Sequence, residues 1–109
     1  MTDRLFYKLW TDALNQPSEE MYVSEYGFPE WFDEIASDPF TVIGKLRQIH
    51  SAAHMTMKEI MDKAGLTPYS FGEKFCVNLR TVQHWYAGDR KCPDYFRLAV
   101  CRQLGLLEV

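Results

Sequence analysis

The chain has 109 residues, of which 47% are hydrophobic and 15% aromatic, and its formal net charge is −3 at pH 7. This composition supplies enough apolar side chains for a small folded core and argues against intrinsic disorder. No apolar run is long enough to span a membrane and no basic leader precedes an apolar stretch, so we expect a cytoplasmic protein without a membrane partner.

Cysteine usage and the absence of catalytic motifs narrow the function classes further. Cys76, Cys92 and Cys101 are odd in number and show no C-x-x-C spacing, which indicates reduced thiols and neither a disulfide framework nor a zinc site. The chain has no G-x-S-x-G motif and no glycine-rich phosphate loop. We therefore expect a protein that is not an enzyme and has no cofactor.

In the N-terminal half, apolar residues spaced by three and four predict a series of helices. Thr2 and Ser18 stand where helix N-caps are expected, and Pro17 ends the first helix. No alternating run bounded by turns is present, so no strand is predicted. The expected helices of this half cover residues 3–15, 19–26, 29–35 and 40–54.

Aromatic and acidic side chains are concentrated between Tyr22 and Phe40. These rings could close over the core of the C-terminal helices, or they could form an exposed patch that marks a partner or dimer surface. Core packing with a dimer surface nearby is the favoured interpretation. The aromatic residues concerned are Tyr22, Tyr26, Phe28, Trp31, Phe32 and Phe40.

Two histidines, His50 and His54, are spaced by four on the helix expected over residues 40–54. That spacing can hold a metal, but a zinc hydrolase would show H-E-x-x-H, and the residues between these histidines are Ser51, Ala52 and Ala53. Ordinary helix packing is the favoured interpretation, and no metal site is predicted.

In the C-terminal half, two short helices are predicted with almost nothing between them. Thr67 can cap the first, Cys76 and Val77 form the turn, Asn78 can cap the second, and Gly88 ends it. The second helix buries Val82 and Trp85 and presents polar residues opposite, as any amphipathic helix also does. The expected helices of this half cover residues 57–64, 68–75, 79–86 and 93–104.

Four short motifs occur in this half, at residues 63–67 (Lys-Ala-Gly-Leu-Thr), 71–75 (Phe-Gly-Glu-Lys-Phe), 79–85 (Leu-Arg-Thr-Val-Gln-His-Trp) and 87–91 (Ala-Gly-Asp-Arg-Lys), and Pro93 opens a last helix. Together they resemble the Xre-type, lambda-repressor-like helix-turn-helix proteins of phages, mobile elements and bacterial regulators. The chain departs from that family at Pro68, where Gln is frequent, and at Cys76, where Gly is frequent. Residues 13–27 also resemble small regulators of gut Firmicutes.

The resemblance implies an all-α protein with an acidic aromatic helical extension at residues 1–39 and a lambda-repressor-like helix-turn-helix DNA-binding domain at residues 40–109. It implies a sequence-specific transcriptional regulator whose helix at residues 79–86 enters the major groove of double-stranded DNA. The residues expected to read bases are Leu79, Arg80, Gln83 and His84. Those expected to contact phosphates are Asn78, Tyr69, Arg90 and Lys91.

The charge distribution leaves a second function open. Four basic and nine acidic residues give residues 1–54 a net charge of −5, whereas eight basic and six acidic residues give residues 55–109 a net charge of +2. The basic half suits DNA, and a homodimer would place two half-sites about 34 Å apart. The alternative is a protein-interaction module, antitoxin-like or binding a phage or host factor, that keeps the helix-turn-helix fold and binds through its acidic half.

Overall fold

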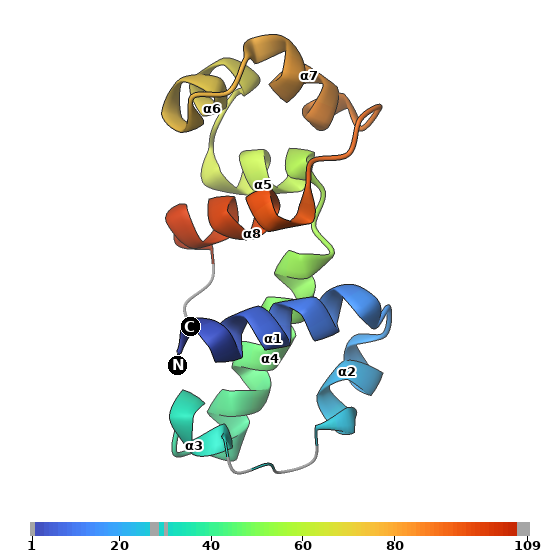
Figure 1. Ribbon diagram of the computed structural model, residues 1–109, viewed down its shortest axis with the longest axis vertical. Coiled ribbons are helices and arrows are strands. Elements are labelled where there is room, and N and C mark those ends of the chain that lie inside the picture. The colour runs from blue at the N-terminus through green and yellow to red at the C-terminus, as the bar shows by residue number, and fades with distance from the viewer. Residues whose placement is uncertain (1, 27–28, 30, 107–109) are drawn as a thin grey trace. The chain divides into compact units, whose positions relative to one another are not determined.

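The computed structural model describes residues 2–26, 29 and 31–106, and these residues form helices and no strand (Figure 1). The expected all-α class is therefore confirmed, and most helix ends lie within a residue of the predicted ones. None of the helices in this part of the chain is long and apolar enough to cross a membrane. The helices are α1 (Asp3–Asn15), α2 (Glu19–Glu25), α3 (Phe32–Ile35), α4 (Pro39–Ala53), α5 (Met57–Ala64), α6 (Pro68–Phe75), α7 (Leu79–Ala87) and α8 (Asp94–Gln103).

The chain divides into two compact units, which do not coincide with the predicted division at residue 39. The described residues up to His54 form the first unit, and Met55–Leu106 form the second. The reason lies in α4, whose apolar face packs on α1 and α2. Because Val42, Leu46 and Ile49 of α4 are fully buried there, the helix belongs to the N-terminal unit.

The core of the first unit is formed where α1 and α4 cross (Figure 1). Thr2 caps α1, since its side chain accepts a hydrogen bond from the backbone N–H of Leu5. The buried residues of α1 recur at three and four, as an amphipathic helix requires. They are Leu5, Phe6, Leu9, Trp10 and Ala13.

Tyr22 of α2 lies inside this core. Its hydroxyl donates to the carbonyl oxygen of Leu9 at 2.9 Å, and its ring contacts those of Tyr26 and His50. The described contacts of Tyr22 thus lie in the first unit, which builds an aromatic core of its own. Phe40, in contrast, is 84% exposed. Phe28 and the side chain of Phe32 lie outside the described residues.

His50 and His54 serve the packing of the first unit. Their rings lie 4.4 Å apart, and each Nε2 donates to a backbone carbonyl at 2.7 Å, His50 to Gln16 and His54 to Ala13. These carbonyls lie in the last turn of α1 and at its C-cap, where the helix supplies few N–H groups, and that of Ala13 also accepts from the backbone N–H of Gln16 at 3.3 Å. The histidine pair therefore caps α1 from α4.

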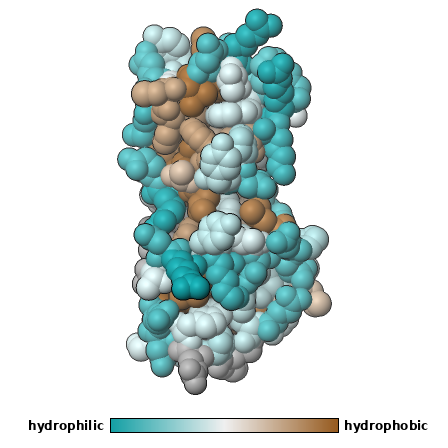
Figure 2. All heavy atoms as spheres, viewed as in Figure 1, coloured by the Kyte–Doolittle hydropathy of each residue, from teal (hydrophilic) through white to brown (hydrophobic). Residues whose placement is uncertain are grey.

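In the second unit, side chains and glycines define the ends of α5 to α7. Thr56 and Thr67 form capping boxes with Glu59 and Ser70, and Gly65 ends α5 in the left-handed conformation. Figure 2 shows apolar side chains reaching the surface between polar ones in the part of the view that α5 to α8 occupy. Three partly exposed rings meet in this unit, because Phe75 and Trp85 each contact Phe96. The fully buried residues of this unit include Ile60, Met61, Phe71, Val82, Val100 and Cys101.

The buried face of α8 includes a charged side chain. Arg97 is buried, whereas Ala99 is exposed. The Arg97 guanidinium donates to the carbonyl oxygen of Met55 at 2.8 Å and to the Asp94 carboxylate at 3.0 Å. A buried charge needs such partners. These two hydrogen bonds allow Arg97 to lie on the buried face of α8, beside Val100 and Cys101.

Tyr22 makes the stability of the first unit sensitive to alkaline pH. Burial raises the pKa of Tyr22 above the ordinary value of 10.0, so above that pH the unfolded chain releases a proton that the folded chain retains. The contribution of Tyr22 to the free energy of unfolding is therefore fully present below about pH 10. Above that pH it falls, by up to about 1.4 kcal/mol per pH unit. In urea unfolding followed by circular dichroism, Tyr22→Phe should lower the free energy of unfolding at neutral pH and make it fall less steeply at alkaline pH.

Tyr7→Phe is the matched control, because it removes an exposed tyrosine hydroxyl from the same unit. It should follow the parent protein at both pH values. An alkaline loss of stability as steep in Tyr22→Phe as in the parent would contradict the assignment.

Candidate nucleic-acid interface

The candidate interface is built on α6, α7 and the tight turn between them. Thr67 caps α6, with Pro68 in its first turn, and Cys76 ends it with φ 56° and ψ 43°. The backbone N–H groups of Cys76 and Val77 both donate to the carbonyl oxygen of Gly72. The left-handed residue thus reverses the chain and satisfies a carbonyl at the end of α6.

Gly72 allows the turn to approach α6 this closely. A Cβ atom built at this position would lie 2.8 Å from the Val77 carbonyl oxygen and 3.8 Å from Val82 Cγ2. Sequence reasoning did not select Gly72 as important. Its signal was an isolated glycine in the middle of a helical pattern, which lowers helix stability relative to alanine and so indicates a packing reason.

α7 begins directly after the turn and has two different faces. The Asn78 side chain accepts from the backbone N–H of Arg80 at 2.8 Å, which caps the helix. Val82 is fully buried, and Tyr86 fastens the helix to α5 by donating from its hydroxyl to Asp62 at 3.0 Å. The opposite face is directed away from the core, because Leu79 is 39% exposed and Arg80 and Gln83 are exposed as well.

The predicted base-reading residues fall into two groups. Among the described residues, no hydrogen bond or ion pair engages the side chain of Arg80 or Gln83, so both can bind an external partner. His84 is instead held in place, since its Nδ1 lies 3.0 and 3.1 Å from the two carboxylate oxygens of Asp89. The hydrogen bond from His84 lowers the pKa of Asp89.

The predicted phosphate-contacting residues are more scattered. Asn78 uses its side-chain oxygen for the cap and keeps its NH₂ group as a donor. Arg90 and Lys91 are exposed in the loop after α7, and the Lys91 ammonium lies 3.7 Å from the Asp94 carboxylate. Tyr69 lies on α6, 62% exposed, and a hydrogen bond to Glu73 raises its pKa. The structure thus gathers seven of the eight predicted residues on α7, its cap and its following loop, and leaves Tyr69 on the neighbouring helix.

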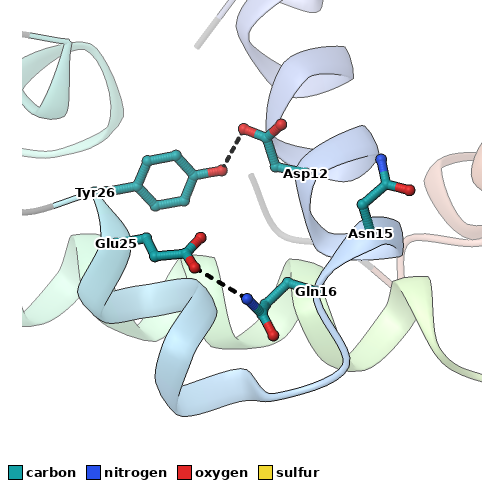
Figure 3. A pocket seen from close by; sticks show the side chains of 5 residues that line it. All are labelled: Asp12, Asn15, Gln16, Glu25 and Tyr26. Atoms are coloured by element: carbon teal, nitrogen blue, oxygen red, sulfur yellow. Dashed lines mark hydrogen bonds between the residues drawn. The ribbon is translucent and has the colours of Figure 1, made fainter.

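A polar hollow lies elsewhere, in the first unit, between α1 and α2 (Figure 3). The Tyr26 hydroxyl donates to Asp12 at 2.7 Å, and the Gln16 side-chain amide donates to Glu25 at 3.0 Å. Burial opposes the charge on Asp12, but hydrogen bonds from Lys8 and Tyr26 outweigh it and lower its pKa. Because these polar groups form hydrogen bonds with one another, we interpret the hollow as part of the packing of α1 on α2. It is lined by Asp12, Asn15, Gln16, Glu25 and Tyr26.

Comparison of the chain with protein-family models, with curated proteins and with solved structures finds no match in any of the three.

The close approach at Gly72 predicts that a single methyl group there disturbs the α6–α7 pair. In Gly72→Ala, the new Cβ meets a backbone oxygen that cannot move without shifting the turn. We expect a loss of about 1–3 kcal/mol in the free energy of unfolding, measured by urea titration. Gly44→Ala in α4 is the control, because nothing lies within 4 Å of its added Cβ. Helix propensity alone should make that control more stable by about 0.5–1 kcal/mol, and equal effects of the two substitutions would contradict the packing argument.

The left-handed conformation of Cys76 gives a prediction of opposite sign. A residue with a Cβ atom is strained at a φ of 56°, and glycine is not. We expect Cys76→Gly to raise the free energy of unfolding by about 1 kcal/mol, measured as an increase in the thermal midpoint. Cys76→Ala, which keeps the Cβ atom, should leave the midpoint near that of the parent. A rise of similar size in both variants would show that the thiol, and not the backbone, carries the cost.

Proposed function

We propose that the protein is a sequence-specific DNA-binding transcriptional regulator in which α6 and α7 act as a lambda-repressor-like helix-turn-helix. The observation that carries this proposal is the exposed, unengaged pair of Arg80, in the first turn of α7, and Gln83, at its middle. Arg binds guanine and Gln binds adenine through paired hydrogen bonds in the major groove, and a recognition helix inserts its N-terminal residues there. Leu79 beside them supplies an apolar contact for a thymine methyl group.

The form of the turn supports this assignment. A recognition helix needs a fixed angle to the helix before it, so that its first residues project from the surface. Here the left-handed Cys76 and the close approach at Gly72 fix that angle, and the buried Val82 holds the opposite face of α7. The fold of the pair therefore leaves the polar face free to enter a groove.

Charge favours phosphate contacts around the same helix. In this proposal Asn78, Tyr69, Arg90 and Lys91 contact the DNA backbone, within a C-terminal half that carries a net charge of +2. So small a charge predicts weak non-specific binding and leaves most of the specific affinity to the base contacts. The protein then acts by binding and not by catalysis, and in a homodimer two half-sites lie about 34 Å apart.

A second candidate function rests on the exposed apolar residues of the first unit. Phe40 is 84% exposed at the start of α4, and Tyr7 and Met21 are exposed on α1 and α2. In a segment that is also acidic, such residues favour a protein partner with a basic and apolar surface. This would make the protein an interaction module, antitoxin-like or binding a phage or host factor.

The DNA-binding proposal predicts a selective loss in Arg80→Ala. Fluorescence anisotropy would compare a duplex from the DNA upstream of the protein's own gene with a scrambled duplex, at low and high salt. The parent should prefer the upstream duplex, with an affinity that falls steeply as salt rises. Arg80→Ala should weaken binding to the preferred duplex by about 1–3 kcal/mol and leave the fold intact.

Lys63→Ala is the matched control, because it removes the same charge from an exposed position on α5. It should weaken binding to both duplexes slightly and equally. An equal loss on both duplexes in Arg80→Ala would refute the base-reading role of Arg80. No binding by the parent even at low salt would favour the interaction module and direct attention to the surface around Phe40.

A further inference from the structure

His84 is the only one of the four predicted base-reading residues on α7 whose side chain is held by another group within the described structure. α7 ends at Gly88, which has a φ of 85° and whose N–H donates to the carbonyl oxygen of His84. This left-handed residue reverses the chain and brings Asp89 back over the last turn of α7. The side-chain bond from His84 to Asp89 follows from that reversal.

The geometry fixes which ring nitrogen of His84 carries a hydrogen. The pKa of Asp89 is lowered below its ordinary 3.8, chiefly by the hydrogen bond from His84, so the carboxylate is ionised at neutral pH. An ionised carboxylate accepts hydrogen bonds and cannot donate them. The hydrogen must therefore lie on Nδ1, and in the neutral imidazole Nε2 is left as an acceptor.

Nε2 has no hydrogen-bond partner among the described residues, and its chemistry limits what it can bind. An acceptor cannot bind a phosphate oxygen, nor the oxygen and N7 acceptors of guanine. In the major groove the donors are the exocyclic amino groups, N6 of adenine and N4 of cytosine.

We propose that Asp89 is a positioning residue that holds His84 as a hydrogen-bond acceptor, so that Nε2 recognises the amino group of adenine or cytosine in the major groove. This inference rests on the proposed DNA-binding function and specifies one of its contacts. Its signature is unusual: at one position of the operator, A or C on a given strand is preferred over G or T, without discrimination between A and C.

His84 also differs from Arg80 and Gln83 in how much side-chain freedom it has before binding. Arg80 and Gln83 must lose side-chain freedom when they bind, whereas the His84 ring is already restrained by Asp89. Restraint before binding reduces the entropy lost on association. A single hydrogen bond accepted by a restrained group is then enough to discriminate between bases.

The test is selection from a pool of random duplexes of about 20 base pairs by the intact protein, at about pH 8. Bound sequences are counted for the parent and for His84→Ala, Asp89→Ala and Asp89→Asn. The parent should show one position at which A or C exceeds G or T by about 3- to 10-fold. His84→Ala and Asp89→Ala should both reduce this ratio towards one.

Asp89→Asn distinguishes the effect of the hydrogen-bond acceptor at residue 89 from the effect of its negative charge. Both Asp89 variants remove one negative charge and should bind all sequences more tightly, but only the asparagine keeps an oxygen that can accept from Nδ1. It should keep most of the preference for A or C. Because Asp89 is exposed, circular dichroism should show both variants folded like the parent.

The possible outcomes separate this inference from the function on which it rests. A parent motif in which no A-or-C preference depends on His84 overturns the inference and leaves DNA binding standing. The same preference in Asp89→Ala as in the parent, or an equal loss in Asp89→Asn and Asp89→Ala, also overturns it. If the parent enriches no sequence at all, the proposed function fails and the inference fails with it.

Discussion

The carbonyl oxygen of Gly72 is the point on which the second unit depends. It accepts hydrogen bonds from two successive backbone N–H groups of the turn, and the turn's own oxygen, that of Val77, passes where a Cβ atom of residue 72 would lie. This geometry leaves no room for a Cβ atom at residue 72 and holds residue 76 in the left-handed region. The direction of α7, the burial of Val82 and the exposure of the opposite face all follow from that contact.

The first unit is held together by a different device. Tyr22 of α2, His50 of α4 and His54 at the end of α4 donate to the carbonyl oxygens of Leu9, Gln16 and Ala13, in the middle of α1 and at its C-terminal end. Such hydrogen bonds are directional, and at a helix end they supply partners that the helix itself provides only in part. Each of these bonds requires one relative placement of two helices. These three polar side chains therefore fix how the helices pack. Apolar contacts between α1 and α4 alone would allow more than one arrangement.

Local signals in the sequence predicted the helices well, because caps and periodic apolar residues act over a few residues. Thr2, Thr67 and Asn78 cap the helices that they were expected to cap, and Cys76 takes up the left-handed turn. What could not be predicted depends on partners distant in sequence. Arg97 is buried because the carbonyl of Met55 receives it, and α4 joins the first unit because its apolar face meets α1. For the candidate site, the residues of α7 were predicted from their place opposite Val82 and from the family resemblance, but the hold of Asp89 on His84 required the fold of the loop after Gly88.

The three thiols differ in their exposure to solvent, and this difference makes the turn between α6 and α7 accessible to selective labelling. Burial raises the pKa of Cys92 and of Cys101 to about 11, so both are protonated and shielded at neutral pH. Cys76 is exposed. Since thiol reagents attack exposed thiolates, a fluorophore added to the unaltered protein should attach at the junction of α6 and α7 alone. The native sequence thus carries a single labelling position beside the surface whose binding partner is in question.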